Sequence, residues 1–406
     1  MTLFDADNHY WESTDCFTRH IPESQLDDAI RIVNVEDADQ DADQDAGDRT
    51  DQADGAGVIY VGDRQFTFLA DSFSENVGKP GALREMLRNL KSGVSIEENT
   101  ALTKRSTPAF RGRDARLALM DEQGLDSVLM FPSLGVCVEH FMRDDPHRTY
   151  LNVQSFNRWI YEDWGFGADG RIYGVPVMSL LDLDQAITEL EWLIDHGAKA
   201  IHLRPGPQAG KCPADPIFDP FWQRVNEAEL LLTFHISESG FNETYSAQWG
   251  ENPNPPSREM SAFQWTSFYG DLPIMQTLSG MIFYNFFTRF PKINVVSVEN
   301  GSLWVPYLMA SMDKMKGMGR NGPWPGGRFK GRPSEVFKEH VFVSPYHEED
   351  VAALAEMIGA GQVLFGSDYP HPEGLAEPAA FRESLSGMSE PDQSLIMGDT
   401  LATLIG

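Results

Sequence analysis

Eight short apolar segments, separated by longer amphipathic ones, constrain the fold of this chain more than any other feature of its sequence. Most are continuous apolar runs, as expected for parallel strands covered on both faces. Between them, residues 182–197 carry apolar side chains at spacings of three and four, and 219–229 leads directly into the next run. The runs are 3–7, 126–132, 171–177, 198–203, 230–236, 293–298, 340–345 and 362–367.

This alternation predicts an α/β fold, a distorted (β/α)8 barrel, with an open doubly wound sheet as the alternative. We expect one barrel domain over residues 1–406. Residues 13–115 are too long for one crossover, so they are predicted to form an insertion that caps the barrel mouth. It would contain a hairpin around 58–69 and a helix over 83–93. A second insertion, rich in aromatic residues, is expected over 240–270.

The charge of the chain excludes some partners. A formal net charge of -29 argues against nucleic acid and anionic membranes as main partners, because both would repel it. Residues 36–56 form an acidic, low-complexity segment, expected to be a solvated and disordered loop, and they lack the register of an EF-hand. No leader-like or membrane-spanning run is present, which predicts a cytoplasmic protein. The three cysteines form no CxxC pair, so a thiolate metal site is not indicated.

Polar, ligand-type residues stand where the predicted strands end. An extended FDADNHYWE segment (4–12) would place Asp5, Asp7 and His9 on one side. Active sites of such barrels lie at the carboxyl ends of the strands. A single histidine there is more often structural, but carboxylate or imidazole groups at five of the eight ends together predict a metal site. The candidate ligands are Asp7, His9, His202, His235, Glu299, His347 and Asp368.

Four motifs carry a family resemblance. They are D-x-H on the first run, FHISES on the fifth, RFPKINVVSVENGS on the sixth and VLFGSDYPH on the eighth. In this order they are similar to the amidohydrolase superfamily, in its aminocarboxymuconate-semialdehyde decarboxylase-like branch. The resemblance implies a distorted (β/α)8 barrel with a divalent metal ion bound by Asp7, His9, His235 and Asp368.

The chain departs from the family pattern at two positions. Asp7 replaces the first histidine of the usual H-x-H pair, and Glu299 stands where many relatives have a histidine that can act in catalysis, so that role is not carried over. His202 and His347 are additional imidazoles. Mixed histidine and carboxylate ligands suit ferrous iron or manganese, whereas zinc prefers nitrogen and sulfur. Seven candidates can hold two metal ions, with Glu299 or Asp368 as a bridge.

This ligand set resembles the carboxylate-rich site of nonheme di-iron monooxygenases of the platensimycin and platencin diterpenoid pathways. The resemblance implies two iron ions, dioxygen as co-substrate, an external electron donor, and an antibiotic-biosynthesis role for this oxidoreductase. Glu299, Asp368 and His202 would be its catalytic residues.

A bulky hydrophobic substrate, such as a terpenoid acid or its thioester, fits the aromatic loop that contains Trp249 and Trp265. Arg204 is a candidate partner for its carboxylate, although an ordinary salt bridge is equally consistent. The alternative function is a hydrolase or nonoxidative decarboxylase with one zinc or manganese ion, in which Asp368 acts as base. A metal-free binding protein is a third interpretation. The sequence leaves the oligomeric state open, including a homo-oligomer.

Overall fold

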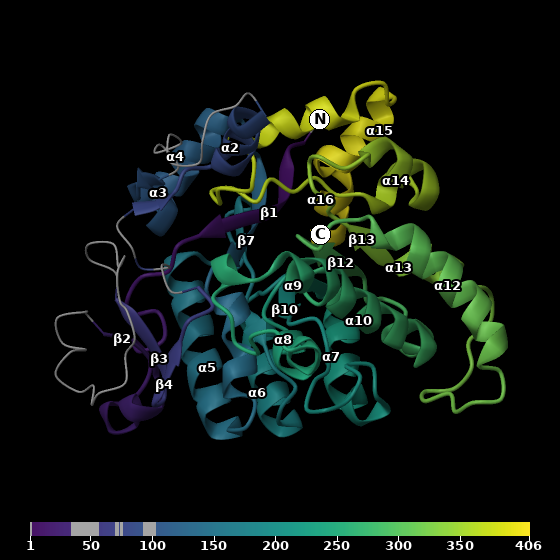
Figure 1. The fold of residues 1–406 in the computed structure, drawn as a ribbon, viewed down its shortest axis with the longest axis horizontal. Coiled ribbons are helices and arrows are strands. Elements are labelled where there is room, and N and C mark those ends of the chain that lie inside the picture. The colour runs from purple at the N-terminus through teal and green to yellow at the C-terminus, as the bar shows by residue number, and fades with distance from the viewer. Residues whose placement is uncertain (1, 34–56, 70–72, 74–75, 92–102) are drawn as a thin grey trace.

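The computed structural model describes residues 2–33, 57–69, 73, 76–91 and 103–406. The predicted acidic loop, 36–56, lies outside the described residues. Parallel strands stand at the centre of the molecule, and helices surround them (Figure 1). These strands form two parallel sheets, with the strand orders β1-β7-β8 and β9-β10-β11-β12-β13.

Each predicted strand except the last corresponds to one or two observed strands, and all of them pair in parallel. The run 171–177 is divided in two, because Pro176 has no N–H to continue the ladder. The barrel strands are β1 (Phe4–Tyr10), β7 (Ser127–Pro132), β8 (Ile172–Gly174), β9 (Val177–Met178), β10 (Ala200–Leu203), β11 (Leu231–His235), β12 (Val295–Val298) and β13 (Val341–Val343).

The eighth run closes the barrel without forming a regular strand. The backbone N–H of Leu364 donates to the carbonyl of Val343 at 3.0 Å, and that of Ala6 donates to Phe365 at 2.8 Å. The segment thus lies between β13 and β1. Its ladder is short because Asp368 has a positive φ of 53° and a proline, which cannot donate, follows Tyr369. The predicted distorted (β/α)8 barrel is therefore confirmed.

An apolar layer fills the barrel below its carboxyl ends. One buried cluster combines Phe4 and Phe131 with Leu231 and Val296 from four strands, and Leu401 of α16 (Thr400–Ile405) packs against it. The pairing of β1 with β7 shifts register between Asp5 and Asn8. This irregularity lets β1 present Phe4 to the apolar layer and still turn later side chains toward the mouth.

Helices follow the strands as the amphipathic segments predict. Asp182 caps α6 by accepting a hydrogen bond from the N–H of Gln185, and Gly197 with φ 80° follows the helix end. The longer described helices of the barrel are α4 (Arg113–Gln123), α5 (Pro146–Asp163), α6 (Leu183–Asp195), α7 (Asp219–Ala228), α10 (Asp271–Phe283), α12 (Trp304–Met318), α13 (Pro333–His340) and α14 (Val351–Ile358).

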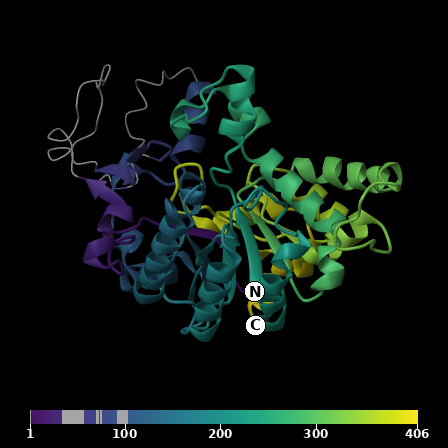
Figure 2. The same ribbon diagram turned by 90° about the horizontal axis from the view of Figure 1, so that it is seen from below.

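The insertion between β1 and β7 forms small antiparallel sheets, at the left of Figure 1. The hairpin predicted around 58–69 is present as β3 and β4, and the helix predicted over 83–93 is α2. Figure 2 shows the chain termini together at one end of the barrel and insertion elements at the other. The elements are β2 (Ile30–Val33), β3 (Val58–Val61), β4 (Arg64–Phe66), β5 (Asn76–Gly78), α2 (Ala82–Lys91), β6 (Thr103–Arg105) and α3 (Pro108–Arg111).

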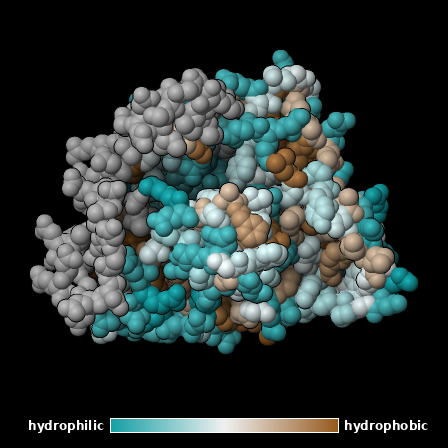
Figure 3. Space-filling view, in the orientation of Figure 1, coloured by the Kyte–Doolittle hydropathy of each residue, from teal (hydrophilic) through white to brown (hydrophobic). Residues whose placement is uncertain are grey.

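The second predicted insertion contains only short helices, among them α8 (Phe241–Thr244) and α9 (Ala262–Ser267). On the face seen in Figure 3, apolar residues form scattered patches between larger hydrophilic areas. None of the described helices combines the length and the apolar composition that a membrane span requires.

Candidate metal centre

Four parts of the barrel contribute side chains at its mouth: β1, β11, and the residues just beyond β12 and the closing segment. His9 Nε2 on β1 and His235 Nε2 on β11 lie 3.1 Å apart, and Asp7 Oδ1 lies 3.1 Å from the first and 3.5 Å from the second. Glu299 Oε2, just beyond β12, lies 3.1 Å from His235 Nε2. Asp368 Oδ1, beyond the closing segment, lies 3.6 Å from His9 Nε2. Five predicted ligands thus come together.

The tautomer of His235 suits a metal ligand. Its Nδ1 lies 2.8 Å from the backbone carbonyl of Ile236, which can only accept a hydrogen bond. Nδ1 therefore carries the proton, and Nε2 presents its lone pair to the cluster. A lone pair facing another imidazole nitrogen and two carboxylates is the arrangement that a cation between them would stabilise.

The electrostatics of the cluster also fit a cation. Burial, followed by repulsion from His371, lowers the pKa of His9 to about 3, which keeps its imidazole neutral. Burial, followed by repulsion from neighbouring carboxylates, raises the pKa of Glu299 and of Asp368 well above their usual range. Burial would raise the pKa of Asp7 too, but hydrogen bonds with both histidines lower it. A divalent ion would bind the neutral imidazoles and neutralise the carboxylates.

The ligand atoms form overlapping groups. Asp7, His9, His235 and Glu299 can converge on one ion, and Glu299 also groups with Asp368 and Glu373. A carboxylate has two oxygens, so Glu299 belongs to two groups of ligands without conflict. Glu299 and Asp368 both have positive φ, 55° and 53°, which is uncommon for residues other than glycine. Strained backbone of this kind concentrates at functional sites.

Buried hydrogen bonds hold the ligand-bearing strands in place. Asp5 accepts hydrogen bonds from the N–H of Asp7 at 3.1 Å and from the N–H of Ser367 at 2.9 Å, and so ties β1 to the residue before Asp368. Arg116 of α4 donates to the carbonyl of His9 at 2.6 Å. Asp5 is thus an outer-sphere residue, and burial raises its pKa to about 7.

His371 extends the centre in a way that the sequence did not reveal. Its Nδ1 lies 2.6 Å from Asp368 Oδ1, and its Nε2 lies 2.8 Å from Ser133 Oγ. Ser133 Oγ in turn donates to the carbonyl of Tyr10 at 2.8 Å. The His371 ring also lies 4.2 Å from that of His9, measured between centroids. A continuous chain of contacts therefore fixes Asp368 against β7.

Glu373 was missed for the same reason as His371. Both stand in the SDYPHPEG stretch after Asp368, where prolines make side-chain direction unreadable from period-two spacing. The one available signal was that His371 and Glu373, both ligand-type residues, follow the candidate ligand Asp368 closely in the sequence.

Two predicted histidine ligands lie outside these groups of described residues. The ring of His202 lies 6.3 Å from that of His235, and its buried Nε2 has no hydrogen-bond partner among the described residues. His347 lies with its Nε2 3.2 Å from Glu348 Oε1 and lines a separate hollow of 270 Å³ with Glu383. Their roles as ligands stay predictions.

The structure also shows where the predicted substrate-binding residues lie. Arg204 is buried, and its guanidinium donates to Glu139 Oε2 at 2.5 Å and to backbone carbonyls, among them that of Ser239 at 3.1 Å. These bonds hold the guanidinium in place within the protein. Trp249 and Trp265 are 72% and 47% exposed, and the ring of Trp265 packs edge-on against Tyr269.

Comparison with known proteins identifies the family. Residues 4–400 match the family model described as amidohydrolase. The chain belongs to the amidohydrolase family. This amidohydrolase is similar to the crystal structure of an amidohydrolase from Mycobacterium avium subsp. paratuberculosis K-10. The TM-score is 0.85 and the sequence identity 33%, over 100% of this chain and 99% of that chain. No curated protein matches it in sequence.

Several decarboxylases share the fold of this amidohydrolase. The 5-carboxyvanillate decarboxylase of Sphingomonas paucimobilis has a TM-score of 0.54 at 20% identity, over 72% of this chain and 82% of that chain. The dihydroxybenzoic acid decarboxylase of Polaromonas sp. JS666, which has bound manganese, has a TM-score of 0.54 at 16% identity, over 81% of this chain and 97% of that chain. At this identity the likeness shows the barrel fold. The family match and the cluster of histidine and carboxylate side chains together make this amidohydrolase a metal-dependent enzyme of the superfamily.

Proposed function

We propose that this amidohydrolase uses one divalent metal ion, manganese or zinc, to decarboxylate or hydrolyse a carboxylate substrate without oxidation. One observation carries the proposal: Asp7 Oδ1, His9 Nε2 and His235 Nε2 face one another within 3.5 Å. The manganese held by a decarboxylase of the same fold supports it. The structural neighbours act on aromatic carboxylates, so a hydrophobic carboxylate is the substrate class to test first.

The residues of the chain have separable tasks in such a reaction. A divalent ion, when bound, supplies Lewis acidity that orients a substrate carboxylate or polarises an acyl group. His9, His235 and Asp7 would hold it. Decarboxylation releases carbon dioxide and leaves an electron pair on carbon, which must take a proton. The 2.6 Å contact between Asp368 Oδ1 and His371 Nδ1 holds a proton at the edge of the site, where it can be delivered.

The test is carbon dioxide release under strictly anaerobic conditions from a panel of hydroxylated and apolar carboxylates, with the manganese-loaded and zinc-loaded protein. Release that requires the metal and is unaffected by oxygen supports the proposal. Absence of turnover under argon, together with turnover of the same substrates in air, would contradict it.

A second candidate function is a nonheme di-iron monooxygenase of the platensimycin and platencin type. The specific observation in its favour is that Glu299 belongs to two ligand groups, one with Asp7, His9 and His235 and one with Asp368 and Glu373. Carboxylate-rich sets of this kind suit ferrous iron. The ions would supply the activation of dioxygen. In such a reaction, one atom of dioxygen would enter a C–H bond of a bulky hydrophobic substrate, and the other would leave as water with two electrons from an external donor and two protons.

Metal content separates the two candidates. The protein is loaded anaerobically with Fe(II), Mn(II) or Zn(II), freed of excess metal, and analysed for bound ions. One ion per chain that is indifferent to oxygen favours the decarboxylase or hydrolase. Two iron ions per chain, with an optical change on exposure to air, favour the monooxygenase.

A further inference from the structure

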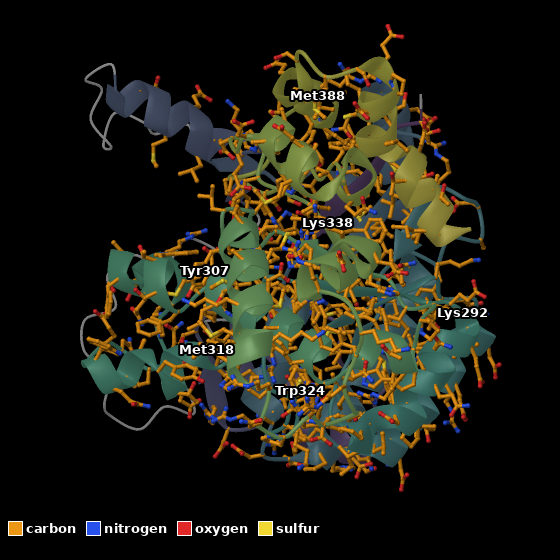
Figure 4. All side chains as sticks on the ribbon, turned by 90° about the vertical axis from the view of Figure 1, so that its right-hand side faces the viewer. Lys292, Tyr307, Met318, Trp324, Lys338 and Met388 are labelled. Atoms are coloured by element: carbon orange, nitrogen blue, oxygen red, sulfur yellow. The ribbon has the colours of Figure 1, made fainter. Side chains whose placement is uncertain are left out.

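A second concentration of charge lies at the outer end of α12. Asp313, Lys316, Arg320, Trp324 and Arg328 line a hollow of 410 Å³ there. This volume is within the range of small-molecule sites. Figure 4 shows this side of the molecule, with Trp324 labelled beyond α12 and Lys338 on α13 well apart from it.

The segment that forms the hollow reverses the charge of the chain. The whole sequence has 61 acidic and 32 basic residues. Residues 314–332 contain no aspartate or glutamate, and their basic residues are Lys314, Lys316, Arg320, Arg328, Lys330 and Arg332. In a chain with a net charge of -29, an anion-attracting surface of this kind is a local exception.

Three of these cations have no carboxylate partner within the described part of the chain, and they are held in place by other groups. Lys316 Nζ donates to the carbonyl of Phe329 at 3.2 Å and lies 4.1 Å from the centre of its ring. Arg320 donates to the carbonyl of Gly317 at 3.1 Å. Arg328 donates to the carbonyl of Arg320 and lies over the Trp324 ring at 5.3 Å. These contacts orient the cations without neutralising them.

The one acidic side chain that lines the hollow does not supply the missing negative charge. Asp313 accepts hydrogen bonds from Arg332 at 3.0 Å and from the N–H and hydroxyl of Ser334 at 2.9 and 2.7 Å. Arg332 therefore satisfies Asp313, and the three oriented cations remain uncompensated.

We propose that this hollow, defined by Lys316, Arg320, Trp324 and Arg328, binds a small phosphate-bearing anion. Guanidinium groups match the geometry of phosphate oxygens, and an ammonium group adds a point charge. The half-buried ring of Trp324, which lines the hollow, offers an apolar wall to whatever group carries the phosphate. The proposal is independent of the reaction at the metal centre.

The experiment measures binding by isothermal titration calorimetry, with the full chain in its metal-loaded form. Three probes separate the contributions to affinity. Inorganic phosphate tests the anion alone, adenosine tests the aromatic ring alone, and AMP carries both groups. The variant Arg320→Ala with Arg328→Ala removes two cations from the hollow. The variant Lys314→Ala with Lys338→Ala is the matched control, because it removes the same charge from exposed positions on α12 and α13 that do not line the hollow.

We expect AMP to bind at one site, phosphate to compete with it, and adenosine not to bind. The arginine variant should bind AMP about 10- to 100-fold more weakly, because two charge-assisted contacts are lost. The lysine control should stay within about twofold of the parent. Absence of AMP binding at millimolar concentration, binding of adenosine equal to that of AMP, or equal weakening in both variants would overturn the proposal. Unchanged thermal unfolding of both variants shows that each is folded.

Discussion

The metal centre and the hollow at the end of α12 both gather charges of one sign, but the chain builds them in opposite ways. The metal centre takes its candidate ligands from positions as distant as Asp7 and Asp368, and it buries most of them. The hollow takes its cations from a single segment, 316–328, and leaves its arginines exposed. The metal centre therefore depends on the closed barrel, whereas the hollow depends on one helix and one loop.

The difference determines what each region does to stability. Buried like charges oppose folding until an ion neutralises them, so a bound metal ion should stabilise the barrel. Exposed like charges are screened by water and salt, so their removal should leave the fold almost unchanged. A third region, the buried ion pair Glu139–Arg204, is the intermediate case, because its opposite charges are already satisfied within the protein.

The largest effect is expected from His235→Ala, which removes the ligand whose tautomer is fixed. Metal affinity should fall by more than about 100-fold, since loss of outer contacts alone costs 10- to 100-fold. Manganese should raise the unfolding temperature of the parent protein and leave that of the variant unchanged. His196→Ala, a histidine that follows α6 and packs on Trp192, is the control and should bind metal normally. If His235→Ala kept the metal affinity of the parent protein, the metal centre would not lie at this position.

Much of the barrel could be predicted from the sequence, because its strands are continuous apolar runs with local signals. The strand β11 and the candidate ligand His235 at its end are examples. The closing segment at 362–367 was harder, since its irregular pairing depends on the backbone of Asp368 and the proline after Tyr369. Its apolar run gives no sign of that geometry.

The position of the candidate ligands was predictable where they lie in a strand or directly after it, and less so where they follow a turn. Asp7, His9 and Glu299 are of the first kind, and His371 is of the second. The register shift after Asp5 also defeated simple alternation, which had grouped Asp5 with Asp7 and His9. Instead, Asp5 turns to Ser367.

The second prediction concerns Glu139→Gln, which leaves Arg204 buried without a charge partner. The variant should lose about 3–5 kcal/mol of unfolding free energy at pH 7. Burial would raise the pKa of Glu139, but Arg204 outweighs burial and lowers it below its ordinary value of 4.5. The pair therefore stabilises fully above about pH 4.5 and loses its contribution as the pH falls through the folded-state pKa.

Urea unfolding at pH 7 and near pH 3 measures this difference, which should narrow at the lower pH. The control is Glu243→Gln, because Glu243 pairs with Arg143 and is half-exposed. This variant should lose less than about 1 kcal/mol of unfolding free energy at either pH. A gap between the parent and Glu139→Gln that is the same at both pH values would show that packing, and not the charge pair, explains the loss.

Replacement of His371 tests how much the residues around the candidate ligands contribute to metal binding. Because its contact with Asp368 orients that carboxylate, His371→Ala should weaken metal binding by about 10- to 100-fold. Ser133→Ala removes only the contact at the far nitrogen, so it should have a smaller effect. Competition with a metal-sensitive dye reports the affinity without reference to turnover. Equal affinities in the parent and His371→Ala would make His371 a packing residue only.

The smallest effect is expected in the basic hollow. Arg320→Ala combined with Arg328→Ala should change the free energy of unfolding by less than about 0.5 kcal/mol, because both side chains are exposed and neither has a carboxylate partner within the described residues. Urea unfolding at low salt checks this. Destabilisation by more than about 1 kcal/mol would mean that the arginines hold the loop beyond α12 to the barrel. The two regions would then no longer differ in this respect, since removing charges from either one would change the stability of the fold.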